Sequence, residues 1–119
     1  MRQSRGDIYY RVCERLDHEK VFLDPDLSLA KFSAMVGTNT TYLSNTINDR
    51  FGCNFHTLIN NYRIQYVAEL LRTGERKENL HTLCGFVSKS AFYDAFVKRM
   101  GQSPLRYQRE CLAQLESRT

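Results

Sequence analysis

The chain has 119 residues, a formal net charge of +4 and a sequence pI near 9.0. A chain of this length forms one domain, or two very small helical units that share a linker, and it is too short for a second large domain. Lys and Arg outnumber Asp and Glu by 6 to 3 in residues 81–119, whereas residues 1–26 contain 5 basic and 6 acidic residues. A polyanionic partner would therefore be attracted mainly to the C-terminal third.

The four cysteines indicate reduced thiols rather than a disulfide framework or a metal site. Cys13, Cys53, Cys84 and Cys111 are far apart, form no C-x-x-C pair and lie in apolar helical contexts. His81 and Cys84 form one H-x-x-C pair, but no second pair completes a zinc site. We therefore expect a chain without metal or other cofactor.

The sequence also lacks the motifs of an enzyme or a membrane protein. It contains no Gly-rich phosphate loop, no paired carboxylate on an identifiable cleft and no nucleophile with a partner base. The opening MRQSRGDIYY lacks the apolar stretch of a signal peptide, and no segment approaches the ~20 apolar residues that cross a bilayer. We expect a soluble, cytoplasmic chain that is not an enzyme.

Helical periodicity dominates the sequence. Apolar residues recur mainly at helical spacing, and only Pro25 and Pro104 interrupt the chain, which predicts an all-α fold. A first helix is expected at about 7–19. The apolar stripe of this helix consists of Ile8, Val12 and Leu16, with Tyr9 and Cys13 beside it.

Two short helices joined by a turn are predicted for residues 27–52. Ser28 and Asn39 are suited to cap their N-termini, and Gly37 and Gly52 to end them. The residues expected to face inward are Leu29, Phe32, Ser33 and Val36 in the first helix, and Tyr42, Leu43, Ile47 and Phe51 in the second. Such a pair with a Gly-containing turn is the helix-turn-helix signature, although many helical hairpins share it.

A long amphipathic helix at about 55–72 is predicted to link this pair to a second one at about 78–101. The apolar stripe of the long helix consists of Leu58, Ile59, Tyr62, Ile64, Val67, Ala68 and Leu71. The second pair should have Ser88 as an N-cap and Gly101 at its end. Its inward residues are expected to be Phe92, Phe96, Val97 and Met100. A last helix, at about 104–115, begins with Ser103 as N-cap and Pro104 at its first position.

The two pairs of short helices form an internal repeat. A shift of 49 residues places Leu43 on Phe92, Ile47 on Phe96, Arg50 on Arg99 and Gly52 on Gly101. A repeated helical hairpin is a stronger indication than either copy alone.

Three stretches of the chain carry one resemblance. They are LSLAKFSAMVGTNTTYLSNTINDRFG, NYRIQYVAELL and GFVSKSAFYDAFVKRMGQSPLRY, the last with Gly85-Phe86, Phe92, Phe96, Gly101, Pro104 and Tyr107. They are similar to the first helix-turn-helix, the linker helix and the C-terminal signature of the DNA-binding domain of AraC/XylS-type bacterial transcription regulators. The resemblance covers about residues 27–109. The opening YYRVCERLDHEKVFLDPDLSL looks like the segment that precedes this domain in Bacteroides-type regulators, so residues 1–26 are expected to be an N-terminal helix and junction segment.

The resemblance implies seven helices, with two tandem helix-turn-helix units held by the linker helix, and recognition helices that enter successive major-groove segments on one face of DNA. Carried over residue by residue, the base-reading positions are Thr41, Ser44 and Asn45 in the first recognition helix and Lys89, Ser90, Ala91 and Asp94 in the second. The residue pattern agrees, because a recognition helix needs an apolar face for docking and an opposite face of side chains that reach base edges.

Two of these positions depart from the family. Asn45 and Asp94 stand where many relatives present an arginine, so two bidentate guanine contacts are missing. Asn can bind adenine, whereas Asp can accept from a cytosine N4 but is repelled by phosphates. Asp94 is therefore either a specificity filter or the mark of a weak second unit, and Lys89 one turn earlier is a possible ion-pair partner. His81 and Lys77 also depart from the pattern, which predicts a short or displaced helix before Gly85.

Phosphate contacts are expected at the rim of these helices. The candidates are Arg50, Arg63, Lys98, Arg99 and the backbone N–H groups at Ser103, where a helix begins. The expected partner is double-stranded promoter DNA. A sensory or dimerisation domain is expected outside this chain, and a homodimer in the full-length protein.

The main alternative is a helical protein-interaction module without DNA binding, which would dock a partner helix on the Ile8/Val12/Leu16 stripe. An adaptor groove should be apolar, whereas the outward faces of 40–48 and 89–94 are short and polar. A third possibility, RNA binding, would require exposed aromatic side chains for base stacking, and the sequence pattern places none.

Overall fold

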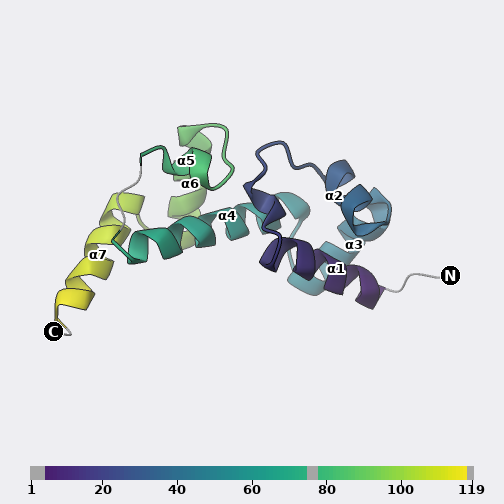
Figure 1. Ribbon diagram of the computed structural model, residues 1–119, viewed down its shortest axis with the longest axis horizontal. Coiled ribbons are helices and arrows are strands. Elements are labelled where there is room, and N and C mark those ends of the chain that lie inside the picture. The colour runs from purple at the N-terminus through teal and green to yellow at the C-terminus, as the bar shows by residue number, and fades with distance from the viewer. Residues whose placement is uncertain (1–4, 75–77, 118–119) are drawn as a thin grey trace. The chain divides into compact units, whose positions relative to one another are not determined.

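The computed structural model describes residues 5–74 and 78–117. In that part of the chain it contains seven α-helices, one short 3-10 turn and no strand, which confirms the all-α prediction (Figure 1). The elements are α1 (Arg5–Asp17), η1 (Val21–Leu23), α2 (Leu29–Val36), α3 (Thr40–Phe51), α4 (Phe55–Arg72), α5 (Leu80–Leu83), α6 (Lys89–Met100) and α7 (Pro104–Ser117). The chain divides into two compact units, Met1–Asn60 and Asn61–Thr119.

The first unit is built from α1, α2 and α3, each of which packs on the other two. Ile8, Val12 and Leu16, the predicted stripe of α1, are at most 1% exposed. They share this interior with Phe32 and Val36 of α2, which are equally buried. The stripe is therefore not available to a partner helix, and the observation on which the adaptor alternative rested is removed.

The predicted caps of α2 and α3 are confirmed. Ser28 Oγ accepts a hydrogen bond from the Lys31 backbone N–H at 3.0 Å, and Asn39 Oδ1 accepts one from the Tyr42 N–H at 2.9 Å. Each helix ends at a glycine with positive φ, Gly37 at 75° and Gly52 at 71°. This left-handed conformation favours glycine, which has no Cβ.

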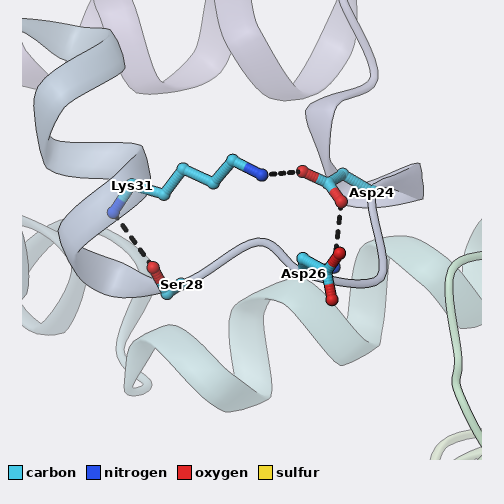
Figure 2. Close-up of polar contacts among 4 residues, drawn as sticks. All are labelled: Asp24, Asp26, Ser28 and Lys31. Atoms are coloured by element: carbon cyan, nitrogen blue, oxygen red, sulfur yellow. Dashed lines mark hydrogen bonds and ion pairs between the residues drawn. The ribbon is translucent and has the colours of Figure 1, made fainter.

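The segment before α2 is fixed by Asp24. Its carboxylate accepts a hydrogen bond from the Asp26 N–H at 2.9 Å and pairs with Lys31 Nζ at 2.6 Å, as Figure 2 shows. Lys31 therefore stabilises two neighbouring features. Its backbone N–H donates to the Ser28 cap, and its side chain pairs with the Asp24 carboxylate of the preceding turn. The 3-10 turn Val21–Leu23 that precedes Asp24 was not anticipated from the sequence.

The interior face of α3 differs from the predicted one at two positions. Tyr42 was expected to face inward but is 54% exposed, whereas Thr46, which was not selected, is fully buried. The buried stripe is Leu43, Thr46 and Ile47, at spacings of three and four residues. Tyr42 lies one position away from this stripe, on a different side of the helix.

The second unit gathers around one core. The core residues are Ile64, Val67 and Leu71 of α4, Cys84 and Phe86, and Phe92 and Phe96 of α6. Figure 1 shows α5, α6 and α7 around the C-terminal half of α4. The aromatic rings form a chain in which Phe96 contacts Phe92 at 5.9 Å and Tyr107 of α7 at 5.7 Å between ring centroids. This chain joins α7 to the interior of the second unit.

The caps of α6 and α7 also occur as predicted. Ser88 Oγ accepts from the Ala91 N–H at 3.1 Å, and Ser103 Oγ accepts from the Arg106 N–H at 3.2 Å. One inward prediction is wrong, because Val97 is 45% exposed. It follows Phe96 directly and is turned away from the side on which Phe92 and Phe96 pack.

The helix before Gly85 is short, as expected. α5 has four residues and begins after Asn79, whose φ is 57°. Gly85 follows with a φ of 93°, and the Phe86 N–H then bonds back to the His81 carbonyl at 2.8 Å. This turn directs the Phe86 ring into the core. Lys77, the other departure noted in the sequence, lies outside the described residues.

Candidate nucleic-acid interface

The outward face of α3 is polar. Thr41 and Asn45 are exposed and Ser44 is half-buried, on the side opposite Leu43 and Ile47. Because the Asn39 side chain caps the helix at its start, this face begins at the first turn of α3. The three base-reading candidates of the first unit therefore share one accessible surface.

The outward face of α6 presents the four candidates of the second unit. Lys89, Ser90, Ala91 and Asp94 are all exposed. Across the described ranges, neither Lys89 nor Asp94 takes part in an ion pair, so the pairing suggested by the sequence is not found. Residues five apart on a helix point in different directions, whereas those three or four apart are neighbours. The Asp94 carboxylate therefore remains accessible.

Two further residues of α6 are exposed that the sequence pattern did not place on the outward face. Tyr93 is 48% exposed, with its ring edge-on to Phe92 at 5.8 Å, and Val97 is 45% exposed. The 49-residue shift places them on Ser44 and Asn48, two outward residues of α3. The internal repeat was the signal that would have identified them. With Tyr10 and Tyr42, Tyr93 also shows that the chain does expose aromatic rings, contrary to the expectation used against RNA binding.

The cationic side chains expected to contact phosphate divide into exposed and buried ones. Lys98 and Arg99 are exposed in the last turn of α6, and Arg50 is exposed in the last turn of α3. Arg63 was expected at the same kind of rim but is buried, with 9% of its surface exposed. Its guanidinium carbon lies 5.5 Å from the centroid of the Phe86 ring. Arg63 is thus a packing residue of the second unit in this structure.

Ser103 marks a helix start in the second unit. Its side chain is half-buried, and its hydroxyl and carbonyl oxygens accept from the N–H groups of Arg106 and Tyr107 at 3.2 and 2.9 Å. The first N–H groups of a helix lack intrahelical partners and carry partial positive charge. A DNA phosphate is a suitable acceptor for those that remain.

The thiol whose pKa is strongly raised, Cys84, lies in the core of the second unit and not on the candidate interface. Burial raises the pKa of Cys84 to about 12, with a smaller opposing effect of a hydrogen bond from the Phe86 backbone. A protonated, buried thiol is neither a metal ligand nor a nucleophile. In the described part of the chain, no group of three or more His, Cys, Asp or Glu residues is placed to hold a metal ion. None of the described helices is both long and apolar enough to span a membrane.

Comparison with known proteins gives one consistent family. The model of the helix-turn-helix domain family matches residues 32–110. The C-terminal domain of AraT, a response regulator from Geobacillus stearothermophilus, is 29% identical, with a TM-score of 0.71 over 89% of this chain and 83% of that one. A DNA-binding transcriptional dual regulator from Escherichia coli K-12 has the same fold at 20% identity, with a TM-score of 0.73 over 89% of this chain and 93% of that one.

A curated relative gives the same class. An uncharacterized HTH-type transcriptional regulator of Staphylococcus aureus (strain COL) is 29% identical over 98 residues, which are 82% of this chain and 13% of that protein. The fold and these matches define the class: a helix-turn-helix, DNA-binding domain of the kind found in transcription regulators, which is not an enzyme family. The chain belongs to the helix-turn-helix domain family in its AraC-type form, which confirms the resemblance noted in the sequence.

Proposed function

We propose that the chain binds promoter DNA with both helix-turn-helix units, α3 and α6 entering adjacent major-groove segments. The observation that carries the proposal is the two-sided character of both helices. Leu43 and Ile47 of α3, and Phe92 and Phe96 of α6, are at most 2% exposed. The side chains on the opposite faces are mostly short and polar, which leaves them free to reach base edges.

Base reading is assigned to the exposed faces of the two helices. The residues are Thr41, Ser44 and Asn45 in α3, and Lys89, Ser90, Ala91 and Asp94 in α6. Asn45 has the amide geometry for a bidentate contact with adenine, and Lys89 is a donor suited to guanine O6 and N7. We expect the first unit to prefer adenine where relatives with arginine prefer guanine.

Phosphate contacts are assigned to Arg50, Lys98, Arg99 and the backbone N–H groups at the helix start after Ser103. Three of these are exposed cations at helix C-termini, and the fourth is a helix N-terminus, where anions bind. Arg63 was a sequence candidate for the same role. Its burial beside Phe86 favours a different one, which is to hold the loop that precedes α6.

The chain acts, in this proposal, as the DNA-binding part of a longer regulator in the cytoplasm, located on the nucleoid. Its match spans only 13% of the curated relative, and two of the similar solved structures are C-terminal domains of response regulators. A sensory or dimerisation domain would supply the signal. Dimerisation would let two copies occupy a repeated operator.

The test is selection of bound duplexes from a random-sequence DNA pool, followed by a salt titration of the best binder. Two enriched motifs centred about 10 base pairs apart would support reading by both units. A single motif would limit base reading to one unit. Absence of both enrichment and salt-dependent binding would refute the proposed function.

A further inference from the structure

The N-terminal helix α1 lies outside the family match, which begins at residue 32, yet it is fixed to the first unit. Its buried stripe contributes to the core, and two of its arginines cap the end of α2. Arg11 Nη1 donates to the Val36 carbonyl at 2.7 Å, and Arg15 Nη2 donates to the Met35 carbonyl at 3.0 Å. These carbonyls belong to the last turn of α2, where a helix has no partner of its own for them and carries partial negative charge.

Tyr9 extends this attachment to the recognition helix. Its ring lies 5.5 Å from the Phe51 ring, and the Arg50 guanidinium carbon lies 4.2 Å from the centroid of the Tyr9 ring. Tyr9 is half-buried and Arg50 is exposed. The last turn of α3 therefore rests on an aromatic side chain from a helix that the family model does not include.

The contact is a cation–π contact rather than an ion pair. The pKa of Tyr9 is raised above its ordinary value of 10.0, first by a hydrogen bond with Cys13, so the phenol is neutral at neutral pH. The ring then attracts the guanidinium through its negative face. A guanidinium that stacks on a ring keeps the N–H groups at its edge available, and these are the groups that donate to phosphate.

Restricting Arg50 has a consequence for binding. A free arginine side chain loses much rotamer entropy when it contacts a phosphate. A side chain already held over a ring has lost part of this rotamer entropy before binding, so less entropy is lost when it contacts the phosphate.

We propose that Tyr9 is a positioning residue for DNA binding, which holds the Arg50 guanidinium in place for a phosphate and makes α1 a working part of the first DNA-binding unit. The inference rests on the proposed function, in particular on the phosphate role of Arg50. Tyr9 itself is not assigned a DNA contact.

The experiment is a double-mutant cycle in the 119-residue chain, with affinity for a mixed-sequence DNA duplex measured over a range of salt. The variants are Tyr9→Leu, Arg50→Ala and the two combined, with Tyr9→Phe as the conservative variant. Tyr9→Leu should weaken binding about two- to fivefold, the range that an exposed cation–π contact provides. It should have no further effect once Arg50 is alanine, and Tyr9→Phe should bind like the unmodified chain.

A structural role for Tyr9 gives a different pattern. If Tyr9→Leu only loosened the first unit, the loss would be equal with and without Arg50, and this equality would overturn the inference. Tighter binding by Tyr9→Leu would also overturn it, since Tyr9 would then withhold Arg50 from DNA. Tyr10→Leu is the matched control, because Tyr10 is the neighbouring tyrosine, 70% exposed, and makes no contact with Arg50 among the described interactions.

Failure of the inference can be told from failure of the proposed function. Without any binding of the unmodified chain to duplex, the proposed function itself fails. Normal binding by Arg50→Ala would remove Arg50 from the interface and the inference with it. Weakened binding by Arg50→Ala alone, with Tyr9→Leu unchanged, would overturn the inference and leave the proposed function standing.

Discussion

Asp94 is the residue of α6 whose charge opposes that of its proposed partner. Its carboxylate is exposed on the same face as Lys89, Ser90 and Ala91, and it forms no ion pair with any residue that the structure describes. An exposed carboxylate near phosphates is repelled, unless a cytosine N4 donates to it. The interaction that Asp94 makes with DNA therefore determines whether the second unit contacts bases or only the phosphate backbone.

Removing the Asp94 charge tests these two roles. We expect both Asp94→Ala and Asp94→Asn to bind a mixed-sequence duplex more tightly, by about 1 kcal/mol, because one like-charge repulsion is lost. The sequence preference obtained by duplex selection should stay unchanged. Weaker binding together with loss of a preferred cytosine would instead identify Asp94 as a base-reading filter.

At the scale of the helix, α3 contains a polar group that its packing leaves unsatisfied. Thr46 is fully buried between Leu43 and Ile47 in the stripe, and its hydroxyl has no hydrogen-bond partner among the described residues. Burying such a group without a partner costs free energy. The stripe on which α3 docks is thus less stable than an entirely apolar one would be.

Replacing this hydroxyl with a methyl group should stabilise the chain. We expect Thr46→Val to raise the free energy of unfolding by about 1 kcal/mol, measured by urea unfolding. Ser33→Ala is the matched control in α2, because the buried Ser33 hydroxyl does donate to the Ala30 carbonyl at 2.8 Å and its removal should bring no gain. A lower stability of Thr46→Val would show that the hydroxyl is bonded in solution.

Cys84 links the core of the second unit to the pH dependence of its stability. Its pKa rises from an ordinary 9.0 to about 12 in the folded chain. Above pH 9 the unfolded chain releases this proton and the folded chain retains it, so unfolding is favoured as the pH rises. We expect the free energy of unfolding to fall between pH 9 and about 12, by up to ~1.4 kcal/mol for each pH unit from this group.

The measurement is urea unfolding between about pH 8 and pH 10. Among the groups whose pKa is raised in the folded chain, the Cys84 thiol has the lowest ordinary pKa, so it dominates the change in this range. Tyr9 and Tyr107 also have raised pKa values, and they add to the slope above pH 10. Cys84→Ala should lower the stability at about pH 8, where the loss of packing dominates, and should flatten this dependence. An equal slope in Cys84→Ala would assign it to other groups.

Over the whole molecule, the positive charge is unevenly distributed. The chain carries a net charge of +4, and Lys98 and Arg99 are adjacent exposed cations at the end of α6. A protein that neutralises phosphates releases counterions, so its affinity falls with salt in proportion to the number of contacts. The slope of log affinity against log salt therefore reports how many cationic side chains contact DNA phosphates.

Lys98→Ala combined with Arg99→Ala should weaken binding to all sequences alike. The slope of log affinity against log salt should flatten by about one unit for each lost phosphate contact. Arg72→Ala combined with Arg106→Ala removes the same charge and is the matched control, because these arginines are paired with Glu69 and Glu110 in their own helices. Equal flattening in the two double variants would mean that net charge alone, not the position of Lys98 and Arg99, sets the slope.

The sequence by itself determined the helices, their caps and the repeat. These depend on contacts within a few residues of one another, such as Ser28 with Lys31 or Ser88 with Ala91, so local spacing is sufficient to predict them. It also predicted the outward position of Ser90 and Asp94, because they lie on the side of the helix away from Phe92 and Phe96. The base-reading roles themselves came from the family resemblance.

Only the tertiary structure decided which side chains are covered by distant parts of the chain. Arg63 carries a charge that predicts exposure, but it is buried beside Phe86, 23 residues further on. Tyr42 and Val97 are apolar enough to suggest burial, yet they are 54% and 45% exposed. The stacking of Arg50 on Tyr9 joins residues 41 positions apart, and no local pattern encodes it because it exists only when α1 docks on α3.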